Sequence, residues 1–144
     1  MIKIKNINRT PLEEKALIKL IESFCNVKKD IFLRFDGRIG SYGLYVYNAK
    51  KQRHDITISN KMFQFKNKKA RIYELIGTIL HEVKHAQQQE KVGSKTFTSR
   101  GFGYNVDFEI AAEPADYFSA REIEARVFEN EVLLSAIIFY WKNC

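Results

Sequence analysis

The segment ILHEVKHAQQQE, residues 79–90, carries two of the three histidines of this 144-residue chain. His81 and His85 are four residues apart, and Glu82 directly follows the first of them. Two histidines one helical turn apart can both reach one metal ion, and HExxH on a helix is typical of a zinc site whose glutamate acts as a general base. The pattern therefore raises the question of whether these residues lie on a helix, and on which face.

Apolar residues recur at helical spacing through residues 71–90 and predict a helix there. At about 100° per residue they form one stripe, and the two histidines lie together on the opposite side, about 40° apart. Glu82 is rotated by about 100° from His81, which places it to hold a water rather than the metal. The stripe comprises Ile72, Ile76, Ile79, Val83 and Ala86, with Leu75 and Leu80 on its flanks.

Two histidines leave a catalytic zinc ion one protein ligand short. The remaining histidine, His54, lies upstream at the start of a predicted strand, so we look for a carboxylate on a helix expected over residues 120–140. Ser119 and Glu122 have the spacing of a capping box, which assigns Glu122 to the helix start. Glu124 diverges from Glu122 by about 160° and borders the apolar stripe that we predict to be buried. That stripe comprises Ile123, Val127, Leu134, Ile137, Ile138 and Trp141.

We therefore predict that Glu124 is the third zinc ligand, because a ligand should border the core and point inward. Glu131 shares its face two turns later and is the first alternative. Glu113, in the long connection before the helix, is the second alternative.

The N-terminal half predicts one more helix and a small sheet. Thr10, Pro11 and Glu13 have the pattern of an N-cap, a first-turn proline and a capping-box acid, so a helix is expected over 11–26. Strand-like runs at 31–35, 43–48 and 54–60, separated by turn-like segments, predict an antiparallel meander. The expected fold class is α+β, in which a small antiparallel sheet packs on the HExxH helix between N- and C-terminal helices. Residues 1–144 are expected to form a single domain.

Composition limits the compartments and partners expected for this protein. No run approaches the roughly 20 apolar residues of a membrane span, and MIKIKNINRT lacks the apolar core of a secretory signal. Cys25 and Cys144 show no disulfide framework, so we expect a cytoplasmic protein. The net charge of +7, with five basic residues at 61–71, is compatible with a nucleic-acid partner and equally with a solvated loop. The oligomeric state is not predicted.

ILHEVKHA followed by EIEARVF resembles the gluzincin metallopeptidases, in particular the ImmA/IrrE-like group. In that group a glutamate directly before an alanine on a later helix completes the HExxH site. The resemblance implies a minimal zincin fold, with His81, His85 and Glu124 as zinc ligands and Glu82 as the catalytic base. The chain also resembles SprT-like proteases in its strand–HExxH order, but lacks their third histidine after His85.

The expected function is hydrolysis of peptide bonds in a protein or peptide substrate by a zinc-activated water. Tyr104 and Tyr117, in the connection at 91–118, are candidate hydrogen-bond donors to the oxyanion. The edge of the strand at 54–60 is a candidate site for an extended peptide. The alternative is a zincin-fold regulatory or binding module with weak or no catalysis, acting on nucleic-acid-bound proteins.

Overall fold

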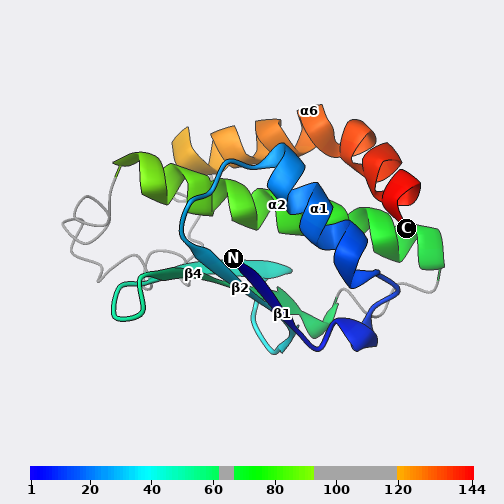
Figure 1. Ribbon diagram of the computed structural model, residues 1–144, viewed down its shortest axis with the longest axis horizontal. Helices are drawn as coiled ribbons and strands as arrows, with labels where there is room; N and C mark the ends of the chain where they lie inside the picture. The colour runs from blue at the N-terminus through cyan, green and yellow to red at the C-terminus, as the bar shows by residue number, and fades with distance from the viewer. Residues whose placement is uncertain (62–66, 93–119) are drawn as a thin grey trace.

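The computed structural model describes residues 1–61, 67–92 and 120–144, and shows an α+β fold (Figure 1). Within these residues a four-stranded mixed sheet carries three α-helices and one short 3₁₀ turn. The strands are β1 (Ile2–Lys5), β2 (Asp30–Gly37), β3 (Gly43–Asn48) and β4 (Arg53–Ser59). The helices are α1 (Glu14–Phe24), α2 (Lys68–Val92) and α6 (Ala120–Asn143), and η1 (Ile7–Arg9) is the 3₁₀ turn.

The sheet corrects the prediction of an antiparallel meander. Its strand order is β1-β2-β4-β3, in which β1 and β4 both run parallel to β2, and only β3 runs antiparallel to its neighbour β4. The strand β1 was not predicted. The other three strands lie close to the predicted ranges, so the pairing was wrong rather than the strands.

The connection between β2 and β3 explains the difference. Five residues, 38–42, separate these strands, and a chain of that length spans up to about 17 Å. Two strand spacings amount to roughly 10 Å. The chain can therefore pass the neighbouring position and place β3 at the sheet edge, and β4 then returns between β3 and β2 as the second strand of a hairpin.

The helices lie on one side of the sheet (Figure 1). Along β2, Ile31, Leu33 and Phe35 are buried and alternate with more exposed residues, as expected of a sheet with one covered face. From α1, Leu17 and Leu20 are fully buried in the same core. Burying such a side chain stabilises the fold by about 1.5–3 kcal/mol relative to leaving it exposed.

Helix α1 begins later than predicted, at Glu14. The Glu13 side chain accepts a hydrogen bond from the Ala16 amide and so caps the helix. The Thr10 amide and hydroxyl both donate to the Ile7 carbonyl, and the hydroxyl accepts from the Leu12 amide. Thr10 therefore closes the 3₁₀ turn η1 rather than starting α1.

Helices α2 and α6 pack side by side in opposite directions (Figure 1). The contacts pair late residues of α2 with early residues of α6, as in Gln88 with Glu124, and earlier residues with later ones, as in Gly77 with Leu133. Helix α2 also packs against β3 and β4, so its side chains are covered by the sheet on one side and by α6 on another.

The face of α6 that packs inward differs from the predicted stripe. Of that stripe only Ile137 is buried, and the other members are at least 44% exposed: Ile123, Val127, Leu134, Ile138 and Trp141. The buried residues of α6 are Ala125, Ala136, Ile137 and Tyr140. This helix carries large apolar residues around much of its circumference, so their pattern did not identify the inner face, which carries two small alanines.

None of the helices in the described residues is both long and apolar enough to span a membrane.

Candidate metal centre

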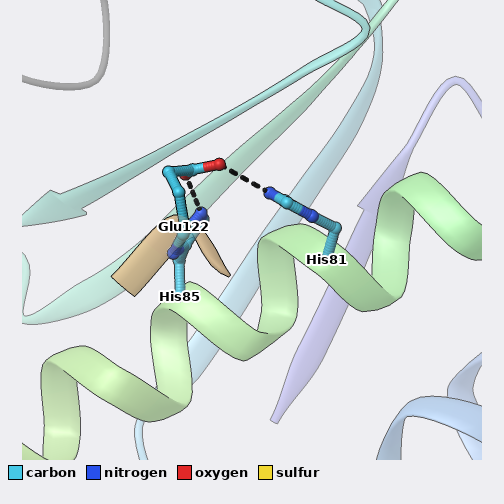
Figure 2. A group of neighbouring side chains, drawn as sticks. All are labelled: His81, His85 and Glu122. Carbon is cyan, nitrogen blue, oxygen red and sulfur yellow. Dashed lines mark hydrogen bonds and ion pairs between the residues drawn. The ribbon is translucent and has the colours of Figure 1, made fainter. Parts of the chain in front are cut away.

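Three side chains converge between α2 and α6. His81 and His85 extend from consecutive turns of α2, and Glu122 from the first turn of α6 lies between the two imidazoles (Figure 2). The Nε2 atom of His81 is 3.2 Å from Glu122 Oε2, and the Nε2 atom of His85 is 2.6 Å from Glu122 Oε1. One ligand atom from each residue lies within 4.8 Å of the others. The arrangement provides two imidazole nitrogens and one carboxylate oxygen.

The Nδ1 atom of each histidine faces away from this cluster and has its own partner. His81 Nδ1 lies 3.2 Å from Glu129 Oε1, and His85 Nδ1 lies 2.8 Å from Gln88 Oε1. The Gln88 amide nitrogen donates to the Arg121 carbonyl at 3.0 Å and to Glu124 Oε1 at 2.6 Å. The amide nitrogen is thus committed to two acceptors, so the amide oxygen is the atom that faces His85.

These partners determine where the imidazole protons lie. A carboxylate and an amide oxygen can only accept hydrogen bonds, so each Nδ1 must donate. In a neutral imidazole the Nε2 atom then carries a lone pair. Both Nε2 atoms face Glu122, which is itself an acceptor, and the cluster therefore requires positive charge, either a proton or a metal cation.

The pKa shifts of His81 and Glu122 also favour positive charge in the cluster. Burial lowers the pKa of His81, but hydrogen bonds to Glu122 and Glu129 and the charge of Glu82 outweigh it and raise the pKa to about 10. Burial raises the pKa of the Glu122 carboxyl, but its contacts with His81 and His85 hold the pKa well below the usual range. The site thus favours bound positive charge strongly enough to overcome its own burial.

The donor set suits a zinc ion. Zinc bonds to imidazole nitrogen and carboxylate oxygen of about 2.0–2.2 Å place neighbouring ligand atoms of a tetrahedral site roughly 3.3 Å apart. In this structure one ligand atom from each of the three residues lies within 4.8 Å of the others, and the two histidines contact different oxygens of Glu122, so the three groups are close enough to share one metal ion after side-chain adjustment. Three protein ligands would leave a fourth position for water, as in catalytic rather than structural zinc sites.

The structure places Glu122, and not the predicted ligand Glu124, beside the histidines. Glu124 instead accepts the hydrogen bond from Gln88, and Glu122 occupies the expected position. The cause is the orientation of α6, since its inner face contains Glu122 and Ala125 rather than Ile123 and Val127. Spacing alone could not identify this orientation, because Glu122 and Glu129 have the same seven-residue separation as Glu124 and Glu131.

Glu82 is buried beside the first residue of the edge strand β3. A Cβ atom on Gly43 would lie 2.9 Å from Glu82 Oε2 and 2.8 Å from Thr78 Cγ2. The strand can therefore approach this part of α2 closely only because Gly43 has no side chain. The charge of Glu82 also acts on His81, which places the two groups in one electrostatic environment.

His54 is buried outside this cluster. Its Nδ1 and Nε2 atoms each lie 2.8 Å from a partner, the Tyr45 hydroxyl and Glu90 Oε2 respectively. The Tyr45 ring neighbours both histidines, with its centroid 5.7 Å from that of His54 and 6.3 Å from that of His85. His54 is thus a packed residue of the sheet, apart from the cluster of His81, His85 and Glu122.

The predicted oxyanion donors, Tyr104 and Tyr117, lie outside the described residues, as does the alternative ligand Glu113. The other alternative, Glu131, lies on the exposed side of α6 and is not part of the cluster.

Comparisons of the chain with models of known protein families, with curated proteins and with solved structures gave no significant match. The function of the chain is therefore inferred from the geometry of the cluster.

Proposed function

We propose that this chain is a zinc-dependent peptidase in which His81, His85 and Glu122 bind the metal and Glu82 is the general base. The observation that carries the proposal is the convergence of two histidine Nε2 atoms and one carboxylate at a partly buried site, while both Nδ1 atoms face other acceptors. A gluzincin-like fold is part of the same proposal. Here Glu122 replaces Glu124, the residue before Ala125 that the resemblance implied.

Glu82 distinguishes a catalytic site from a purely structural one. A zinc ion held by two imidazoles and a carboxylate supplies Lewis-acid chemistry that activates water near neutral pH. Glu82 would accept the proton of the attacking water at its carboxylate and transfer it to the amine released from the peptide bond. The buried setting of Glu82 beside Gly43 holds its carboxylate at the edge of the sheet.

The edge strand β3 supports a peptide as substrate. Among the described residues β3 pairs only with β4, so its other edge can accept an extended peptide by main-chain hydrogen bonding. The prediction that gave this role to residues 54–60 is wrong, because β4 is paired on both sides. A peptide aligned along β3 would pass Gly43, next to Glu82.

Substitution of Glu82 tests the proposal. Zinc-loaded wild type should cleave members of a mixture of unstructured peptides, with products identified by mass spectrometry. Glu82→Gln should retain zinc, because Glu82 is not a ligand, and should lower the rate by about 10²–10⁴-fold through loss of the base. Glu74→Gln, at an exposed position of α2, is the matched control and should behave as wild type. Loss of zinc in Glu82→Gln, or hydrolysis at the wild-type rate, would contradict the assignment.

A further inference from the structure

Gly77 is an unexpected residue in the interior of α2. It is buried and lies one helical turn before His81. Glycine is among the least favourable residues within a helix, because it loses the most backbone freedom on folding. A buried glycine there implies that a neighbouring group occupies the space of the missing side chain.

The group next to Gly77 is the carboxylate of Glu129. A Cβ atom on Gly77 would lie 2.7 Å from Glu129 Oε2, and 3.6 Å from Leu133 Cδ1. The first distance is shorter than any ordinary contact, whereas the second is normal van der Waals spacing. The space left by the absent Cβ atom of Gly77 is therefore filled by one oxygen of the Glu129 carboxylate.

The other oxygen of the same carboxylate faces His81. Glu129 Oε1 lies 3.2 Å from His81 Nδ1, so one side chain contacts both the space above Gly77 and the imidazole one turn later. This contact favours a proton on Nδ1, so that Nε2, on the side of Glu122, is the nitrogen left to bind a metal. Groups that hold metal-ligating histidines in this way typically change metal affinity by about 10–100-fold when removed.

We infer that Gly77 and Glu129 form a positioning pair, in which the glycine admits the carboxylate that orients His81 and adds negative charge beside the metal. The inference rests on the proposed metal site and extends it to two residues that do not touch the metal. It accounts for a glycine in a helix interior and for a carboxylate that lies half-buried between two helices.

Gly77→Ala separates this role from a structural one. The atom in conflict is the end of a flexible side chain, so the variant can fold with Glu129 displaced. Alanine also favours the helix, so the melting temperature of the chelator-treated protein should be unchanged or higher. Zinc affinity, measured by competition with a chromophoric chelator, should fall by about 10-fold or more. Stability and affinity should thus move in different directions.

A double-mutant cycle identifies the route of the effect. Glu129→Ala should weaken zinc binding by a similar factor, and Gly77→Ala should cause no further loss in the Glu129→Ala background. Glu131→Ala, at an exposed position of α6, is the matched control and should leave affinity unchanged. An equal loss on adding Gly77→Ala to Glu129→Ala would overturn the inference, as would wild-type affinity in both single variants. A wild-type protein that binds no zinc would instead contradict the proposed function.

Discussion

The two buried histidine environments of this protein differ in how their partners complement them. His54 lies between one donor and one acceptor, because the ionised Glu90 carboxylate accepts from Nε2 and the Tyr45 hydroxyl donates to Nδ1. His81 and His85 have acceptors on both sides, since their Nδ1 atoms face Glu129 and Gln88 while both Nε2 atoms face Glu122. Only the second environment requires added positive charge, either a proton or a metal cation.

Burial and a nearby carboxylate therefore do not by themselves indicate a metal site. The pKa of His54 is lowered from 6.5, because burial outweighs the favourable contact with Glu90. The pKa of His81 is raised to about 10 although burial opposes it, because two carboxylates contact the ring. The number of acceptors that converge on the imidazole decides whether positive charge is excluded or retained.

The largest loss of zinc affinity is expected when the Glu122 carboxylate is removed from the cluster. Glu122→Ala should weaken zinc binding by more than the roughly 10–100-fold cost of losing an outer partner, because a three-ligand site becomes a two-ligand one. Glu124→Ala should retain zinc, since Gln88 still donates to the Arg121 carbonyl. The two variants are matched, because both remove a carboxylate from the first turns of α6.

Titration of both variants against a competing chelator measures their zinc affinities. Retention of wild-type affinity in Glu122→Ala, together with loss of zinc in Glu124→Ala, would show that α6 has a different orientation from the one described.

A smaller effect, on the pH dependence of folding stability, is expected from His54. Because the pKa of its folded state is lowered, the unfolded chain binds the proton first, and stability is lost as the pH falls below about 6.5. Between pH 7.5 and 5 this residue should contribute a slope of at most about 1.4 kcal/mol per pH unit. The Glu90 carboxyl, whose pKa is lowered from 4.5, should lose its contribution only at more acidic pH.

Urea denaturation of chelator-treated protein measures that slope. His54→Gln should be less stable at pH 7.5 but should show a flatter dependence between pH 7.5 and 5. An identical pH dependence in both proteins would mean that folding does not lower the pKa of His54, and the comparison between the two histidine environments would fail.

The sequence predicted where the helices and most strands lie, and that His81 and His85 share a helix, better than it predicted how these elements pack together. Helical spacing located α2 with its HExxH residues because that pattern depends on local geometry alone. The position of β3 depended on a five-residue connection that can reach more than one neighbour, and the pattern of strands does not determine that choice.

The residue that completes the histidine cluster was missed for a related reason. The large apolar residues of α6 suggested one buried face, but the inner face is the one with Ala125 and Ala136, where small side chains lie against neighbouring elements. The orientation of a helix that is apolar on several sides depends on how it packs, which local spacing does not record. Glu122 and Glu124 lie about 160° apart, so this orientation determined which of them reaches the histidines.

Metal analysis of the wild-type protein after zinc loading and extensive dialysis tests the central claim most directly. We expect about one tightly held zinc ion per chain, as the three converging ligands imply. The same treatment of His85→Ala should leave the protein without stoichiometric zinc. A wild-type protein that retains no zinc after this treatment would contradict the assignment of His81, His85 and Glu122 as a metal centre.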